Sequence, residues 1–292
     1  MPASRLRPRA AVAAALCSLL FLTGCGGTAK GNAAAAYADD AGPVVIGTDG
    51  SAESRIVAAL YGELLADAGV KARMASTRYS SPAATTRAVV EGRIGLAPAY
   101  ETSTLRALPA GQTLPGNMAA TLSMALPQGI DALPPAQAQN GVVLAVTRAT
   151  ARTHGLRTLA DLAKPGRLTL GGPASGDPDA PSVASLQEAY GTHLTETRTS
   201  ATADVLVLRG TDPVITRDGL VVLTDPKNAL PPEHVFPLIG APYAGLAASK
   251  ALASLNSRLT TAQLAVLAAS VDGGAAPSAT ARTWLRSNGL LG

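Results

Sequence analysis

From residue 43 onward, short apolar runs alternate with segments of helical period, and this alternation limits the possible folds more than any other feature. Residues 44–46 form an apolar run of strand length, and Ile56, Leu60 and Leu64 then recur at helical spacing. Alternating strands and helices are typical of layered α/β proteins. We therefore expect an α/β fold with largely parallel sheets.

The same alternation continues to the end of the chain. Stretches rich in proline and glycine separate the periodic segments, and we expect these stretches to be loops. The remaining predicted strands cover residues 94–97, 141–147, 168–170, 205–208 and 220–223, the helices 83–91, 158–163, 183–190, 247–255, 261–271 and 278–287, and the loops 108–116, 132–141, 171–181 and 230–242.

The N-terminus has the layout of a secretory signal. Arg5, Arg7 and Arg9 precede an apolar run over residues 10–22, which continues as Thr-Gly before Cys25. This run is shorter than the roughly 20 apolar residues that a membrane-spanning helix needs. The letters Leu-Thr-Gly-Cys resemble the bacterial lipobox, in which the cysteine is acylated and becomes the first residue of the mature protein.

Acylation of Cys25 would anchor the protein without a transmembrane helix. We expect a signal peptide over residues 1–24, a lipidated flexible tether over 25–42, and a location on the extracytoplasmic face of the cell membrane. The other cysteine, Cys17, leaves with the signal, so the mature domain has no disulfide. Its stability must come from a hydrophobic core, which a chain of about 250 residues is long enough to bury.

The charge balance argues against nucleic acid as a partner. The chain has 24 basic and 20 acidic residues, and removal of the signal would take away three arginines and no acid, leaving 21 against 20. A nearly neutral body has no general attraction for phosphate backbones.

Four segments, in order along the chain, carry a family resemblance. Residues 47–54 read Gly-Thr-Asp-Gly-Ser-Ala-Glu-Ser, and residues 98–103 read Pro-Ala-Tyr-Glu-Thr-Ser. Residues 154–163 precede a Leu-Thr-Leu-Gly strand, and residues 219–234 contain Leu-Val-Val-Leu-Thr-Asp-Pro-Lys and then Leu-Pro-Pro-Glu-His. In these segments the chain resembles the osmoprotectant-binding class of ABC importers, which includes glycine betaine, carnitine, choline and proline-betaine binding proteins.

The resemblance implies a two-lobed fold like that of type II periplasmic binding proteins, with a ligand cleft between the lobes. Lobe 1 would contain residues 43–140 and 230–292, and lobe 2 residues 141–229. The resemblance also implies a monomer that is not an enzyme and that needs no cofactor or metal. Such a protein would capture a small osmoprotectant-like solute, a quaternary amine or a zwitterion, and deliver it to an ABC permease.

Aromatic residues are the first candidates for the ligand site. Proteins of this family hold quaternary ammonium groups among aromatic faces, because a cation without N–H groups is attracted by ring quadrupoles. The resemblance implies Tyr100 as the best ligand contact, with packing at a strand end as the alternative. Tyr79 and Tyr243 stay open between the two roles. We expect the other aromatic residues of the domain to be structural, namely Tyr61, Tyr190 and Trp284.

The chain departs from the family at two positions where an aromatic residue is usual. Arg209 stands before Thr-Asp, and Glu233 stands where the family has a tyrosine after Pro-Pro. A guanidinium at a cage position would repel trimethylammonium and bind a carboxylate or phosphate, which favours an anionic or zwitterionic ligand. The alternative is that Arg209 pairs with Asp212, Glu233 or another acid and closes the lobes.

The remaining candidate ligand residues are polar. A hydroxyl can donate a hydrogen bond to a ligand carboxylate, but a single hydroxyl residue is more often a turn or helix cap than a ligand contact. His234 falls in a segment expected near the cleft, and Asp225 is expected to be structural or part of a hinge. The polar candidates are Thr48, Ser51, Ser103, Thr211 and His234.

Two rival functions come from other classes. An enzyme is disfavoured, because His154, His193 and His234 lack metal-ligand spacing and the chain has no nucleophile elbow or phosphate-binding loop. The stronger rival is a surface lipoprotein that kept the scaffold and acts as a sensor or partner-binding protein. The missing aromatic residues support this second alternative.

Overall fold

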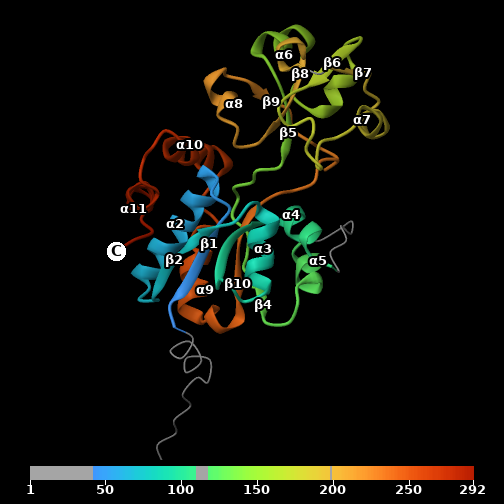
Figure 1. The fold of residues 1–292 in the computed structure, drawn as a ribbon. Coiled ribbons are helices and arrows are strands. Elements are labelled where there is room, and N and C mark those ends of the chain that lie inside the picture. The colour runs from blue at the N-terminus through green and yellow to red at the C-terminus, as the bar shows by residue number, and fades with distance from the viewer. Residues whose placement is uncertain (1–41, 110–117, 198) are drawn as a thin grey trace, which may run out of the picture. The chain divides into compact units, whose positions relative to one another are not determined.

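Two five-stranded sheets, each with its own helices, make up the described part of the chain (Figure 1). In this computed structural model the described residues are 42–109, 118–197 and 199–292, and they belong to one compact unit. The expected α/β fold class is confirmed. The predicted signal, Cys25 and residues 26–41 lie outside the described residues. None of the described helices is long and apolar enough to cross a membrane.

The first sheet takes its strands from both ends of the chain. Its order is β2 (Ala72–Arg78), β1 (Val44–Thr48), β3 (Leu96–Tyr100), β10 (Val235–Gly240) and β4 (Ile130–Ala132). β1 lies parallel to β2 and β3, whereas β10 lies antiparallel to β3 and β4. The accompanying helices are α2 (Ala52–Asp67), α3 (Pro82–Val90), α4 (Glu101–Ala107), α5 (Met118–Ala125), the 3₁₀ turn Ala241–Tyr243, α9 (Leu246–Ala253), α10 (Thr261–Asp272) and α11 (Pro277–Ser287).

The second sheet is built from one continuous stretch of chain. Its order is β7 (Leu194–Glu196), β6 (Leu168–Gly171), β8 (Val205–Arg209), β5 (Val142–Val146) and β9 (Val221–Val222). β6 lies parallel to β7 and β8, whereas β5 lies antiparallel to β8 and β9. The accompanying helices are α6 (Arg148–His154), the 3₁₀ helix Leu159–Ala163, α7 (Val183–Tyr190), the 3₁₀ turn Ser200–Thr202 and α8 (Pro213–Arg217).

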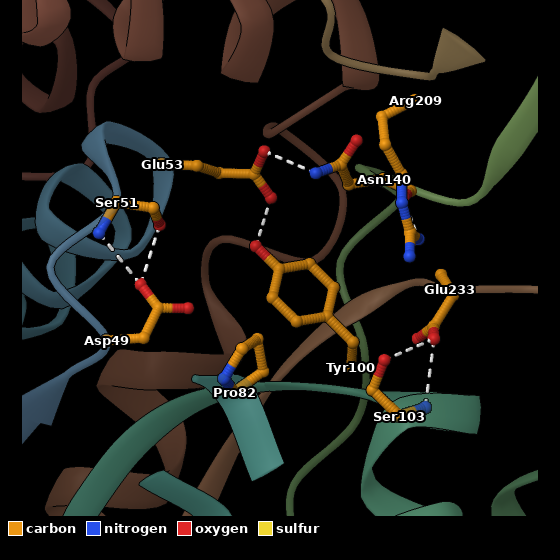
Figure 2. A pocket seen from close by; sticks show the side chains of 9 residues that line it. All are labelled: Asp49, Ser51, Glu53, Pro82, Tyr100, Ser103, Asn140, Arg209 and Glu233. Atoms are coloured by element: carbon orange, nitrogen blue, oxygen red, sulfur yellow. Dashed lines mark hydrogen bonds between the residues drawn. The ribbon is translucent and has the colours of Figure 1, made fainter. Parts of the chain in front are cut away.

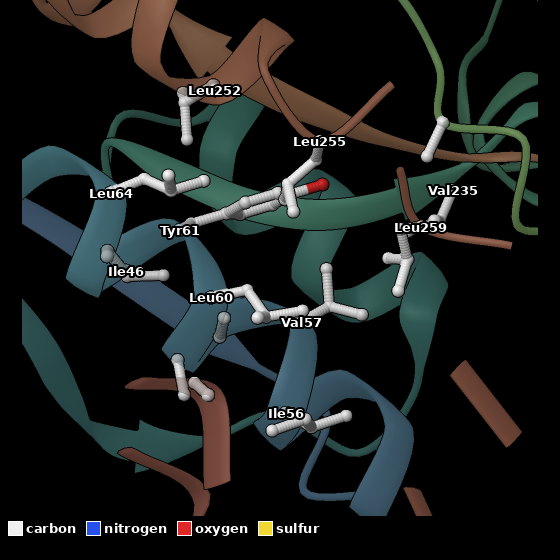
Figure 3. Packing of buried hydrophobic residues seen from close by; sticks show 14 of the residues in the cluster. Ile46, Ile56, Val57, Leu60, Tyr61, Leu64, Val235, Leu252, Leu255 and Leu259 are labelled. Atoms are coloured by element: carbon white, nitrogen blue, oxygen red, sulfur yellow. The ribbon is translucent and has the colours of Figure 1, made fainter. Parts of the chain in front are cut away.

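Helix α2 is the centre of the first hydrophobic core. Ile56, Leu60 and Leu64 recur on its inward side at helical spacing and are buried (Figure 3). Leu252 of α9 and Leu255 after it pack into the same cluster. Helices α9, α10 and α11, from the C-terminal end of the chain, therefore contact α2 near the N-terminal end (Figure 1).

Each sheet has apolar packing of its own. Leu144 and Val205 belong to a separate core beneath the second sheet. A third cluster, which includes Leu105 and Phe236, packs around α3, α4 and the strands of the first sheet. Each sheet is therefore stabilised by hydrophobic contacts within its own half of the structure. Such halves can keep their internal packing if the segments between them bend.

The sheets are mixed, so the expectation of largely parallel sheets is wrong. In each sheet, two of the four neighbouring strand pairs are antiparallel. The loop predicted over residues 230–242 is also wrong in part, because it contains β10. Pro237 of β10 lies opposite Pro98 of β3, and facing residues in an antiparallel pair alternate between bonded and non-bonded positions. The two missing N–H groups therefore need not interrupt the ladder between these strands.

The strongly periodic elements agree best with the sequence-based expectations. Helices α7, α10 and α11 begin and end within one residue of the predicted bounds. The strand expected at residues 94–97 begins two residues later, and the helix expected at 158–163 is a 3₁₀ helix. The sequence did not predict the shorter or more polar elements β2, α4, α5, β4, α6, β7 and α8.

Truncation of Leu60 tests the central role of α2. We expect Leu60→Ala to lower the free energy of unfolding by about 2–5 kcal/mol, because it leaves a cavity in a fully buried site. Val266→Ala on α10 is the matched control, since this apolar side chain is exposed and its loss should cost within about 0.5 kcal/mol. Urea unfolding of both variants measures the difference. Equal losses in the two variants would contradict this account of the core.

Candidate functional site

A cavity of about 240 Å³ lies where several loops and helix ends meet, and it is the candidate functional site (Figure 2). A volume of this size suits a small solute. Its walls come from the loop after β1, the first turns of α2, α3 and α4, the end of β3, the segments that link the two sheets, and the end of β8. The residues that line it are Asp49, Ser51, Glu53, Pro82, Tyr100, Ser103, Asn140, Arg209 and Glu233.

The loop after β1 is built to start α2 at a fixed place. Gly50 has φ +84°, a conformation that favours glycine. Asp49 Oδ1 accepts hydrogen bonds from Ser51 N at 2.9 Å and Ser51 Oγ at 2.7 Å. Ser51 Oγ in turn accepts from Ser54 N at 3.1 Å and caps the helix. The first turn of α2 therefore presents Glu53 beside the ends of β1 and β3.

The Glu53 carboxylate is buried, and both of its oxygens accept hydrogen bonds. Its Oε1 accepts from the Tyr100 hydroxyl, and its Oε2 accepts from Asn140 Nδ2 at 2.8 Å (Figure 2). Oε2 also accepts from Thr211 Oγ1 at 2.6 Å. Thr211 N also donates to Asn140 Oδ1 at 3.2 Å. Burial raises the pKa of Glu53 even though these hydrogen bonds favour its charged form. This network joins a helix of the first sheet to the turn that follows β8 of the second.

Glu233 is a second buried carboxyl group, and only one of its oxygens is bonded. Oε1 accepts from Ser103 N at 2.9 Å and Ser103 Oγ at 2.6 Å (Figure 2). Oε2 is buried and has no hydrogen-bond partner among the described residues. Burial raises the pKa of Glu233 from 4.5 to about 7. This group therefore changes its charge near neutral pH.

Arg209 is already held by carboxylates and a backbone carbonyl. Its Nη1 donates to the Asn140 carbonyl oxygen at 2.9 Å, and its Nη2 pairs with Asp177. The same Nη2 lies 3.8 Å from Asp179, whose other oxygen pairs with Arg106. Of the two alternatives for this residue, the structure contains the pairing with an acid, and the partner is Asp177.

The structure brings most of the predicted ligand residues to one place. Tyr100, Arg209, Ser51 and Ser103 line the cavity, and Thr211 reaches it through the Glu53 carboxylate. Whether they contact a solute stays a prediction.

Two predicted residues lie elsewhere. Thr48 is buried at the end of β1, where its carbonyl accepts from Tyr79 N at 2.9 Å, and it is not among the lining residues. His234 lines a separate, larger cavity of about 1190 Å³. Its Nδ1 lies 2.8 Å from Glu101 Oε2, and this hydrogen bond raises the pKa of His234. A role for either residue at the first cavity would have to be indirect.

The other aromatic residues of the described chain have structural surroundings, and Phe236 and Tyr79 belong to or pack against the third cluster. Tyr61 is in the first core, and Trp284 packs against that core. The Tyr190 hydroxyl donates to Asp225. The Tyr243 ring packs on Gly95, where a Cβ would lie 2.7 Å from the ring. Among the described residues that line the cavity, Tyr100 is therefore the one aromatic side chain.

Sequence reasoning missed several acidic and amide residues of the site. Asp49 and Glu53 stand in the loop and helix start that carried the first family motif, and Glu233 was considered only as a replaced tyrosine and as a possible partner of Arg209. Their position beside predicted strand ends was an available signal. Asn140 lies in a segment predicted as loop, and no sequence pattern indicates its contacts. The described residues contain no group of three or more His, Cys, Asp or Glu side chains that could hold a metal ion.

The raised pKa of Glu233 predicts a loss of stability as pH rises. Between pH 4.5 and 7 the folded protein holds a proton on Glu233 that the unfolded chain releases, so unfolding becomes easier with increasing pH. At pH 8 this difference in pKa lowers the free energy of unfolding by about 3 kcal/mol. We expect Glu233→Gln to reduce the decline in melting temperature between pH 5 and pH 8.

The decline should not vanish in that variant. The pKa values of Glu53 and His234 are also raised in the folded protein, and both groups contribute in the same direction. His234→Asn is the matched control, because it removes only the histidine contribution. A pH profile of Glu233→Gln that coincides with that of the unsubstituted protein would contradict the burial of this carboxyl group.

Comparison with known proteins shows that the fold around this cavity is shared with known binding proteins. A family model described as the substrate binding domain of ABC-type glycine betaine transport system matches residues 42–287. A solved structure titled glycine betaine/carnitine/choline ABC transporter is 20% identical, with a TM-score of 0.74 over 85% of this chain and 99% of that one. Apo YehZ from Escherichia coli is 16% identical, with a TM-score of 0.66 over 85% of this chain and 99% of that one.

A liganded structure shares the fold as well. Lactococcal OpuAC in its closed-liganded conformation with glycine betaine is 14% identical, with a TM-score of 0.50 over 84% of this chain and 96% of that one. No curated protein sequence matches the chain. The expected two-lobed binding-protein fold is therefore confirmed, while identities this low leave the solute to be decided by the site.

Proposed function

Because the chain belongs to the family of substrate-binding domains of ABC-type glycine betaine transport systems, we propose that it captures a small solute outside the cytoplasm and delivers it to an ABC permease. Members of this family bind substrates and are not enzymes, which agrees with the absence of catalytic motifs in the sequence. Their place in a transport system also puts the domain on the extracytoplasmic side of the membrane.

The charge of the cavity supports a solute with a positively charged group. Asp49, Glu53 and Glu233 line it together with one guanidinium, that of Arg209. The guanidinium is balanced outside this set by Asp177 and Asp179. A confined site with an excess of carboxyl groups attracts cations and repels anions, and a bound cation in turn favours the charged form of Glu233. This excess is the observation that carries the proposal of a small organic cation or zwitterion.

The two segments that link the sheets support closure of the protein around its solute. These segments, residues 133–141 and 223–234, meet where Gln139 forms a bridge with His234 and Asn140 N donates to the Glu233 carbonyl oxygen at 2.9 Å. We propose that they form a hinge between lobe 1, residues 43–140 and 230–292, and lobe 2, residues 141–229. Asn140 and Glu233 would then contact the solute from within the hinge.

Binding of a cation should stabilise the protein against heat. In a panel of betaines, choline, carnitine and amines, we expect at least one organic cation or zwitterion to raise the melting temperature of the full chain in detergent, and small anions to leave it unchanged. A ligand at 100 times its dissociation constant adds about 2.7 kcal/mol to the free energy of unfolding. Stabilisation by anions alone would favour Arg209 as the ligand contact. No stabilisation by any solute would favour the sensor or partner-binding lipoprotein.

The lipid anchor is a separate part of the proposal. Cys25 ends a lipobox-like sequence, and we propose that it carries the lipid. Cells fed an alkyne-labelled fatty acid should label the unsubstituted protein and the Cys17→Ser control, but not Cys25→Ser. Label retained on Cys25→Ser, or absent from the unsubstituted protein, would contradict lipidation at this residue.

A further inference from the structure

The strongest unexplained feature of the site is the second oxygen of Glu233. The side chain is 1% exposed, and Oε2 has no donor among the described residues. A buried acceptor without a partner is costly, so such atoms in folded proteins usually have a function. Glu233 is also one of the residues that line the cavity, which places a bound solute next to this side chain.

The nearby donors are already engaged elsewhere. Ser103 gives both its N–H and its hydroxyl to Oε1 of the same carboxyl group. Arg209 donates to Asn140 and Asp177. The Tyr100 hydroxyl donates to Glu53. None of these side chains donates to Oε2 in this structure, so that oxygen has no donor from the described residues.

A second acidic group faces the same space with spare acceptor capacity. Asp49 lines the cavity and uses Oδ1 for both bonds from Ser51, while Oδ2 accepts none from the described residues. An ionised carboxylate offers about four acceptor positions over its two oxygens. The cavity therefore offers hydrogen-bond acceptors in excess of donors.

The site is poorly suited to a cation without N–H groups. A quaternary ammonium is held by the faces of several aromatic rings, each contributing about 0.5–2 kcal/mol. Here Tyr100 is the one aromatic lining residue among those described, and Glu233 stands where the family resemblance implies a tyrosine. A quaternary nitrogen would leave Glu233 Oε2 without a hydrogen bond in the closed site.

We propose that the cationic group of the solute is a protonated amine with at least one N–H, which donates to Glu233 Oε2. Glu233 is then the residue that sets specificity for primary, secondary and tertiary ammonium groups over fully methylated ones. This inference rests on the proposed function, since it assumes that a solute binds in this cavity.

Two methylation series test the inference on the unsubstituted full chain in detergent. The first is ethanolamine, N-methylethanolamine, N,N-dimethylethanolamine and choline, and the second is glycine, sarcosine, N,N-dimethylglycine and glycine betaine. In each series only the last compound lacks an N–H. Isothermal titration should show affinity falling at least tenfold at that last step in whichever series binds.

Substitution of Glu233 then identifies the group responsible. Glu233→Gln should weaken binding of the N–H compounds at least tenfold and bring their affinities close to those of the quaternary compounds. The matched control is Glu188→Gln, because Glu188 is exposed on α7 and does not line the cavity. The control should keep both the affinities and the step at the last methylation.

The possible results separate this inference from the proposed function. Quaternary compounds that bind as tightly as their dimethyl analogues, or more tightly, would overturn the inference and leave solute capture intact. A selectivity for N–H compounds that survives in Glu233→Gln would overturn the role of Glu233. Failure of every compound in both series to bind would overturn the inference and count against the proposed function as well.

Discussion

The buried carboxylate of Glu53 is the interaction on which the site depends. A charged group removed from water is tolerated only when donors surround it, and here three side chains supply them. Tyr100 comes from the end of β3, Asn140 from a segment between the sheets, and Thr211 from the turn after β8. Because each donor is fixed by the same acceptor, the walls of the cavity have defined positions. The start of α2 also favours a negative charge there.

Most of the charges around this carboxylate are paired within the protein. Arg209 is enclosed by Asp177, Asp179 and a carbonyl oxygen, so its charge is largely compensated before any solute arrives. Arg106 from α4 reaches the same Asp179. These pairs connect segments of both sheets, and they leave the cavity itself to the carboxyl groups of Asp49 and Glu233.

Much of the fold was readable from the sequence, whereas the site was readable only in part. The helices with strong periodicity, such as α2 and α10, were predicted because apolar residues at helical spacing indicate a helix with one buried face. β10 was missed because its proline suggested a loop. The sheet tolerates Pro237 because it lies opposite Pro98, which belongs to a strand more than a hundred residues away. Tyr100, Ser103 and Arg209 were placed by motif resemblance. The environment of Glu233 arises from tertiary contacts, so no local pattern could show that one oxygen lacks a donor.

The unpaired oxygen of Glu233 also has a thermodynamic meaning for recognition. A buried acceptor without a donor destabilises the protein by about 1–3 kcal/mol, and a solute that donates to it removes this penalty only in the complex. An analogue that fills the cavity without donating keeps the penalty and adds the desolvation of its own charge. Sites of this kind discriminate far more sharply than apolar pockets do between ligands that differ by one methyl group. A scaffold shared with betaine-binding proteins can therefore change its ligand class through a single buried carboxyl group, with the fold around it unchanged.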